Sequence, residues 1–338
     1  MRVALDVMGG DFAPRELVAG AAIAVNQMDL QVLLVGQPEI IREEIAYQVQ
    51  MGNIEPGRVE ASLEVVPASQ VIAMDEEPVF ALRKKKDASI VVATELVKEG
   101  RADAVVSAGS TGAQMVAALL ILGRMPGVER PAVATVLPGL TGPKVLLDSG
   151  ANADCRPKHL EQFAMMGSAF ATAVLGLNQP KVGLINVGEE ESKGNELTKQ
   201  TYQLLKQAPL NFAGNVEGRE IFSGTAEILV CDGFVGNIIL KLAEGLSATF
   251  IQMLKNELSQ LNSASPSGGA TLLPGLQKLK ERLDYTEYGG APLLGVNGIS
   301  IICHGSSKAR AICNAIRAAK ESADKDLIGR LTVALQQN

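Results

Sequence analysis

The stretch that decides the fold lies near the start of the chain and reads Val3-Ala4-Leu5-Asp6-Val7-Met8-Gly9-Gly10-Asp11-Phe12-Ala13-Pro14. An apolar run of strand length ends in two glycines, and a proline then stands where a helix can begin. Apolar residues at helical spacing follow over 17–27. The segment therefore predicts a buried strand, a tight turn and a crossover helix, which is the repeating unit of parallel α/β sheets.

The same unit recurs along nearly the whole chain. The apolar runs that we expect to form strands are 3–7, 32–35, 63–66, 104–106, 133–137, 145–147, 182–185, 228–230 and 299–302. Segments long enough for a helix, such as 160–175, separate most of them. This alternation favours a three-layer αβα fold with a mostly parallel sheet covered on both faces. We expect residues 1–338 to form one catalytic α/β unit, with two lobes around a cleft as the alternative arrangement.

The composition fits a cytoplasmic globular protein and argues against nucleic-acid binding. Apolar residues make up 47% of the chain, charged residues 20%, and the formal net charge is −6. A general nucleic-acid binder needs excess cations and stacking aromatics, whereas aromatics are only 4% here. Asp6 interrupts any signal-peptide core. The longest apolar run, 115–122, is far shorter than the ~20 residues of a membrane span.

The sequence indicates neither a metal site nor a covalent nucleophile. Cys155, Cys231, Cys303 and Cys313 are far apart and without zinc-ligand spacing, so reduced thiols are expected. No P-loop, GxGxxG or GxSxG pattern occurs. Aspartates after the predicted strands have the oxygen atoms that divalent cations prefer, but orienting loops is the simpler role for them. We expect no metal and no cofactor.

Glycines and small polar residues follow the carboxyl ends of six predicted strands. The segments are 8–14, 107–113, 148–154, 186–196, 232–237 and 304–307. Any one of them is commonly just a turn or a helix cap. Ligands of open α/β sheets bind at this edge, and glycine lets backbone N–H groups at helix N-termini approach an anion. Six such segments on one rim predict an anion site, with 107–112 and 304–307 as the preferred phosphate cradles.

One segment breaks the alternation of strands and helices. Apolar residues recur at helical spacing from 238 to 261, and a second stripe interleaved with lysine and arginine follows over 272–283. We expect a helical hairpin over 238–285 that projects from the body. The stripe over 239–254 either packs on its own core or forms a dimer interface. The residues expected to contact a membrane are Leu258, Leu261, Leu272, Leu273 and Leu276.

Together these segments resemble the phosphate acyltransferases of bacterial phospholipid synthesis, over essentially the full chain. The motifs that carry the resemblance are ALDVMGGD (4–11), SAGSTGA (107–113), LDSGAN (147–152), NVGEE (186–190), KGNE (193–196), DGFVGN (232–237), YGG (288–290) and HGSS (304–307). The resemblance implies a fold similar to phosphotransacetylases and isopropylmalate-type dehydrogenases. It also implies a homodimer that associates peripherally with the membrane.

The activity that the resemblance implies is reversible transfer of a long-chain acyl group from acyl carrier protein to inorganic phosphate. The acyl phosphate product passes to a membrane glycerol-3-phosphate acyltransferase. Phosphate is already nucleophilic and a thiolate leaves readily, so such an enzyme mainly holds the reactants and stabilises the oxyanion. Two alternatives stay open: a phosphotransacetylase that uses acyl-CoA, and a non-catalytic module that binds acyl carrier protein at the membrane.

The resemblance and the rim segments together give candidate site residues. The candidates for catalysis are His304, Asn186, Lys193 and Asp232. The candidates for substrate and phosphate binding are Gly9, Gly10, Asp11, Ser107, Gly109, Ser110, Thr111, Gly112, Asp148, Asn152, Gly188, Asn195, Gly233, Asn237, Ser306 and Ser307. Acyl carrier protein is acidic, so a net-negative enzyme needs a basic patch to dock it. The densest candidate patch is Arg83, Lys84, Lys85 and Lys86.

Three positions depart from the family pattern. Phe12 stands where histidine is usual, Ser110 where asparagine is usual, and Ser149 where a small apolar residue is common. Phe12 excludes an essential proton transfer at that position. The other two replacements leave the chemistry of their loops plausible.

Overall fold

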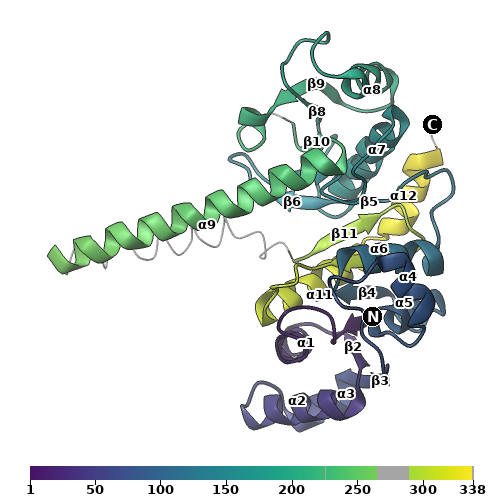
Figure 1. The fold of residues 1–338 in the computed structure, drawn as a ribbon, viewed down its shortest axis with the longest axis vertical. Helices are drawn as coiled ribbons and strands as arrows, with labels where there is room; N and C mark the ends of the chain where they lie inside the picture. The colour runs from purple at the N-terminus through teal and green to yellow at the C-terminus, as the bar shows by residue number, and fades with distance from the viewer. Residues whose placement is uncertain (225, 265–288, 337–338) are drawn as a thin grey trace.

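Two sheets, each covered by helices, form the body of the protein in this computed structural model, which describes residues 1–224, 226–264 and 289–336 (Figure 1). The strand order is β3-β2-β1-β4-β12-β11-β5 in the larger sheet and β6-β7-β10-β8-β9 in the smaller. The strands are β1 (Arg2–Asp6), β2 (Gln31–Gly36), β3 (Leu63–Pro67), β4 (Ala104–Ser107), β5 (Ala132–Val133), β6 (Thr135–Leu137), β7 (Lys144–Leu147), β8 (Val182–Asn186), β9 (Phe212–Glu217), β10 (Ile228–Val230), β11 (Ala291–Leu294) and β12 (Ile299–Ile302).

Helices cover both faces of both sheets. They are α1 (Arg15–Gln27), α2 (Pro38–Gln50), α3 (Pro56–Ser62), α4 (Pro78–Lys84), α5 (Ser89–Lys98), α6 (Thr111–Ala117), α7 (Pro157–Ala173), α8 (Glu196–Gln207), α9 (Gly233–Ala264), α11 (Ala309–Asp324) and α12 (Leu327–Gln336), with the short helical turns η1 (Ala118–Leu122) and η2 (Gly218–Glu220). On the larger sheet, α1, α2 and α11 pack on one face and α4, α5 and α6 on the other. On the smaller sheet, α7, α8 and α12 pack on one face, and the first turns of α9 pack on the other. The predicted three-layer αβα fold is confirmed, and it occurs twice.

Parallel pairing dominates, as predicted. β3, β2, β1, β4 and β12 are parallel neighbours, and so are β7, β10, β8 and β9. Among the described strands, the antiparallel pairs are β11 with β12, β11 with β5, and β6 with β7. The inner parallel strands β1, β2, β7 and β8 bury nearly every side chain, which explains why they consist mainly of Val, Ile, Leu and Ala.

The run predicted as one strand over 133–137 is in fact two strands in different sheets. β5 pairs with β11 in the larger sheet, and β6 pairs with β7 in the smaller. Ala134, between them, donates its N–H to the carbonyl of Pro292 at 3.0 Å. The residue types in 133–137 do not show where the chain leaves one sheet and enters the other. This crossing is one of the links that join the two halves of the molecule.

Two strands, β9 and β11, were not predicted from the sequence, and the reason is similar for both. β9 contains Gly214 at a φ of +100°, next to a register irregularity, and β11 contains Pro292. Glycine and proline weaken the signature of a strand, so neither segment looked like one.

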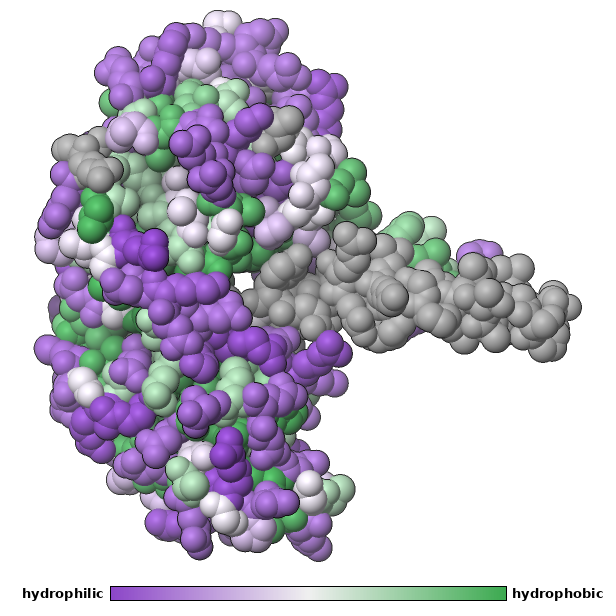
Figure 2. Space-filling model, turned by 180° about the vertical axis from the view of Figure 1, so that it is seen from behind, coloured by the Kyte–Doolittle hydropathy of each residue, from purple (hydrophilic) through white to green (hydrophobic). Residues whose placement is uncertain are grey.

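Helix α9 leaves the body as a rod of 32 residues (Figure 1). It starts at Gly233, before the predicted hairpin start at 238, and the predicted second arm lies outside the described residues. Ile238, Leu242, Leu246 and Met253 are each more than half exposed. Figure 2 shows hydrophobic surface where this helix leaves the body. By length and composition alone, 233–257 is long and apolar enough to cross a membrane. Single polar residues such as Asn237 and Lys241 interrupt 233–257, so this segment contains no long unbroken apolar stretch.

Glycines seat the first turn of α9 on the loop after β7. A Cβ at Gly236 would lie 1.9 Å from the carbonyl oxygen of Asp148, and one at Gly233 would lie 2.7 Å from that of Asn152. The N–H of Gly233 donates to the same Asn152 carbonyl at 2.8 Å. The root of the projecting helix is therefore fixed by direct backbone contact.

We expect Gly236→Ala to destabilise the protein by about 2 kcal/mol, because the added methyl group forces the helix off this loop. Urea unfolding measures the change. Gly245→Ala is the matched control, since a Cβ there meets nothing within 4 Å and should stabilise the same helix by up to about 1 kcal/mol. Equal stability of Gly236→Ala and the wild type would show that the root of α9 is not so constrained.

Candidate active site

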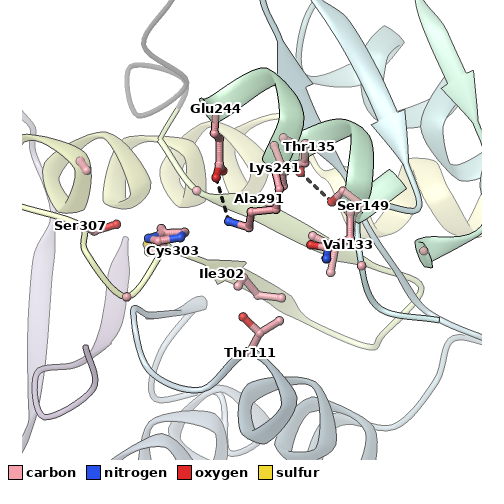
Figure 3. A pocket seen from close by; sticks show the side chains of 18 of the residues that line it. Thr111, Val133, Thr135, Ser149, Lys241, Glu244, Ala291, Ile302, Cys303 and Ser307 are labelled. Atoms are coloured by element: carbon pink, nitrogen blue, oxygen red, sulfur yellow. Dashed lines mark hydrogen bonds and ion pairs between the residues drawn. The ribbon is translucent and has the colours of Figure 1, made fainter. Parts of the chain in front are cut away.

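A cavity of about 650 Å3 lies at the carboxyl ends of strands from both sheets (Figure 3). Loops after β1, β4 and β12 form one wall, and β5, β6, the loop after β7 and helix α9 form the other. The lining includes Asp11, Met74, Gly109, Thr111, Val133, Thr135, Val136, Ser149, Gly150, Ala153, Gly233, Phe234, Asn237, Leu240, Lys241, Glu244, Cys303, His304, Gly305 and Ser307. A concave site at this edge of an α/β fold is where a ligand is expected.

A buried carboxylate, Asp6, organises the wall that belongs to the larger sheet. The Ser107 hydroxyl donates to Asp6 Oδ2 at 2.7 Å, and the Gly109 N–H donates to Ser107 Oγ at 3.0 Å. A Cβ at Gly9 would lie only 2.8 Å from the Cα of Gly109, so the loops after β1 and β4 touch. Burial raises the pKa of Asp6, and the hydrogen bonds it accepts from Ser107 and Met8 oppose the rise.

The loop after β12 presents an exposed histidine to the cavity. The backbone N–H of Ser306 donates to His304 Nδ1 at 3.2 Å, and Ser306 Oγ lies 2.7 Å from the same nitrogen. Because Nδ1 accepts a hydrogen bond, the neutral ring carries its proton on Nε2, a donor suited to an anion. The N–H of Asp11 donates to the Gly305 carbonyl at 2.8 Å, which locks this loop to the one after β1.

A second buried carboxylate, Asp148, shapes the wall that belongs to the smaller sheet. Its Oδ1 accepts from the N–H groups of Val133, Gly150 and Ala151, and its Oδ2 accepts from the backbone and side-chain amides of Asn152. Burial nevertheless raises the pKa of Asp148. With no exposed surface and both oxygens occupied, this carboxylate supports the loop and does not face a ligand.

Two hydroxyls line the same wall. Ser149 donates to the Val133 carbonyl at 3.0 Å, so its oxygen accepts from Thr135 Oγ1 at 2.7 Å. Ser149, where the family pattern has a small apolar residue, thus gains a defined role in the cavity wall.

Cysteine nucleophiles are disfavoured at this site. Cys303 lines the cavity, but burial raises the pKa of its thiol to about 12. Burial, together with the nearby charge of Asp148, raises the pKa of Cys155 to about 12 as well. Both are therefore thiols at neutral pH, and only a thiolate attacks efficiently.

The structure brings together seven of the predicted site residues. Those that line the cavity are Asp11, Gly109, Thr111, Gly233, Asn237, His304 and Ser307. Those that lie behind the lining, in the loops or helix starts that build it, are Gly9, Gly10, Ser107, Ser110, Gly112, Asp148, Asn152, Asp232 and Ser306. Ser110 and Asp232, for example, cap helices by accepting from the N–H groups of Ala113 and Val235.

The segment after β8 does not reach the cavity lining. Asn186 donates its side-chain amide to the carbonyl of Lys193, and Asn195 caps α8 through the N–H of Thr198. Gly188 belongs to the same loop. Strand β8 lies beyond β10 when counted from β6, so the loop that follows it is displaced along the rim.

The departure at Phe12 also has a place in the structure. Its ring is 41% exposed and lies under the ammonium of Lys308, 5.5 Å from the ring centroid, rather than in the cavity lining.

Sequence reasoning missed the cavity-facing side of α9. Asn237, Leu240, Lys241 and Glu244 recur at spacings of three, one and three residues along one helix face, and Phe234 joins them. Extending a helical wheel from the predicted Gly233 and Asn237 would have found this face.

Comparison with known proteins agrees with this geometry. A sequence model described as "Fatty acid synthesis protein" matches residues 1–330. A phosphate acyltransferase of Heliobacterium modesticaldum is 57% identical, covering 98% of this chain and 96% of that relative. One of Desulforamulus reducens is 54% identical, covering 100% and 98%. The chain belongs to the phosphate acyltransferase family. It is an acyltransferase by that membership.

Solved structures of lower similarity share the fold. A phosphotransacetylase from Streptococcus pyogenes superimposes with a TM-score of 0.63 at 18% identity, over 96% of this chain and 94% of that one. A 4-hydroxythreonine-4-phosphate dehydrogenase from Klebsiella pneumoniae gives 0.55 at 14% identity, over 96% and 99%. The expected likeness to phosphotransacetylases is confirmed at the level of the fold.

Asp6→Asn should change how stability depends on pH. A carboxyl group whose folded pKa is raised above its usual 3.8 stabilises the fold at low pH, and this stability is lost as pH rises through the folded pKa. The wild-type unfolding free energy should therefore fall relative to Asp6→Asn above pH 4, with a limiting slope of about 1.4 kcal/mol per pH unit. Urea unfolding of both proteins between pH 4 and 8 measures this, and a difference that stays constant with pH would contradict it.

Proposed function

We propose that this acyltransferase moves a long-chain acyl group from acyl carrier protein to inorganic phosphate, reversibly, and so supplies acyl phosphate for phospholipid synthesis. The observation that carries the proposal is the cavity itself. It joins a histidine N–H donor and glycine-rich strand-end loops to the apolar side chains of Val136, Phe234 and Leu240, and the cysteine in its described lining, Cys303, is a buried thiol. Because both sheets contribute walls, the whole chain is proposed to act as one catalytic unit.

The chemistry needs positioning more than it needs a strong base. A phosphate oxygen attacks the thioester carbonyl carbon, the C–O bond forms, and the C–S bond breaks as the thiolate leaves with its electron pair. His304 Nε2–H is the donor that we propose to bind phosphate or the developing oxyanion. No cofactor enters these steps, and the predicted residues that do not line the cavity are proposed to hold the rim loops in place.

The proposed docking site for acyl carrier protein lies next to the cavity. Arg83, Lys84 and Lys86 are exposed, whereas Lys85 donates to the carbonyl of Val71 and pairs with Glu76 at 2.5 Å. The patch therefore presents three exposed cations rather than four. Met74 lines the cavity, and a Cβ at Gly112 would touch Pro78 at the start of α4. These contacts support an acidic partner that docks beside the cavity mouth.

We further propose that the exposed stripe of α9 forms a homodimer interface and that the part of the hairpin beyond it contacts the membrane from the cytoplasmic side. Leu242, Leu246, Phe250 and Met253 are spaced by four, four and three residues and are 47–67% exposed, which is an apolar face that needs a partner. Leu258 and Leu261 fall in the last turns of α9, while Leu272, Leu273 and Leu276 lie outside the described residues. A membrane contact there would place the product near a glycerol-3-phosphate acyltransferase.

The proposed activity is tested by trapping acyl phosphate with hydroxylamine, using purified acyl-acyl carrier protein or acyl-CoA as the acyl donor. We expect turnover with the carrier thioester, weakening with salt because docking is electrostatic. His304→Ala should raise the phosphate KM about tenfold, since a donor to an anion is lost. Equal, salt-independent use of acyl-CoA would favour a phosphotransacetylase, and binding of the carrier without turnover would favour a non-catalytic module.

The proposed dimer is tested with the double variant Leu242→Glu/Leu246→Glu. Two buried carboxylates in an apolar interface should raise the dimer dissociation constant by about 100-fold or more. Light scattering after size exclusion measures the mass. Gln252→Glu adds a charge to an exposed polar position of the same helix and should stay dimeric. A double variant that remains dimeric would place the interface elsewhere.

A further inference from the structure

The cavity must accept a phosphate dianion, yet its described lining carries more fixed negative than positive charge. Two carboxylates, Asp11 and Glu244, contribute to the lining, and Lys241 is the one lysine or arginine among those residues. An anion that enters such a space is repelled unless an opposite charge is available to it. The charge balance of the cavity therefore depends on Lys241.

The ammonium of Lys241 is held by its neighbour on the helix. Lys241 Nζ lies 2.8 Å from Glu244 Oε2, with the lysine side chain 48% exposed and the glutamate side chain 17% exposed. Figure 3 shows both side chains projecting from α9 into the cavity, joined by this ion pair. A half-exposed ion pair of this kind contributes little stability, so exchanging its partner costs little.

The backbone beneath Lys241 is fixed. Gly233, Asn237 and Lys241 are spaced by four residues on one face of α9, and all three line the cavity. Gly233 and Gly236 press the first turn against the loop that Asp148 organises. The backbone of Lys241 is therefore held in place, while its flexible four-carbon side chain allows the ammonium to reach an entering ion.

We propose that Lys241 is a phosphate-binding residue: its ammonium leaves Glu244 for a phosphate oxygen when substrate enters and returns to Glu244 when product leaves. This inference rests on the proposed function and names a residue for it outside the rim loops. Glu244 is a positioning residue that keeps the ammonium in the empty cavity and competes with bound phosphate. The exchange predicts opposite effects for the two side chains.

The test compares Lys241→Met, Glu244→Gln and the control Lys255→Met, which removes an exposed lysine farther along the same helix and outside the cavity lining. Lys241→Met should raise the phosphate KM about tenfold or more and leave the KM for the acyl donor within about twofold. Glu244→Gln should lower the phosphate KM, because it frees the ammonium. Lys255→Met should behave as the wild type, and Lys241→Arg should recover most of the phosphate affinity.

An unchanged phosphate KM in Lys241→Met, with an active wild type, would overturn the proposal and leave the proposed function standing. An equal rise in both KM values would also overturn it, since that pattern indicates a general structural role. If the wild type makes no acyl phosphate, the proposed function fails, and calorimetric titration with inorganic phosphate then decides. Binding to the wild type that Lys241→Met weakens supports the role of Lys241, whereas equal binding, or none, overturns it.

Discussion

The hydrogen bonds accepted by the buried Asp148 carboxylate are the interaction on which the rest of the structure depends. One of its oxygens reaches Val133 at the point where the chain passes from one sheet to the other, and both oxygens shape the loop 149–152. The Asn152 carbonyl then accepts the N–H of Gly233 in the first turn of α9 at 2.8 Å, and the Asp148 carbonyl leaves no room for a Cβ at Gly236. An unpaired buried carboxylate would cost several kcal/mol, so the five donors are what make this junction possible.

Asp6 has the same role in the larger sheet. It too is buried at a strand end, and it holds Ser107, through which Gly109 is placed at the cavity wall. In both halves the carboxylate is buried, and the loop to which it is hydrogen-bonded lines the cavity. The strand-end loops that line part of the cavity are therefore held in position by buried carboxylates. Such a site suits a reaction in which the substrates bring their own nucleophile and leaving group and the protein supplies placement.

The sequence predicted the elements of this fold better than their arrangement. Nine apolar runs were recognised, most of them because inner parallel strands bury both faces, and the polar segments after six of them were correctly expected at strand ends. Strand order is a tertiary property, so nothing in the sequence showed that β8 stands beyond β10, and Asn186 and Lys193 were grouped with residues that they do not join. Asp148 was expected to touch substrate because an aspartate after a strand looks the same whether it faces a ligand or its own loop. Lys241 was overlooked because a lysine in an apolar helical stripe looks like an ordinary solvated side chain.

Helix α9 connects the two surfaces that the proposed reaction requires, a polar cavity and an apolar face. Its first turns are fixed to the loop organised by Asp148 and present Asn237, Lys241 and Glu244 to the cavity. Leu242, the next residue after Lys241, is 67% exposed, and the exposed apolar residues continue along the helix from it. A long-chain acyl phosphate has a charged head and an insoluble tail, so a site that makes it needs a polar cavity beside an apolar surface that does not end in water. A continuous helix is the simplest way to hold these two surfaces in a fixed relation, because 1.5 Å of rise per residue carries the stripe tens of ångströms from the site without a hinge.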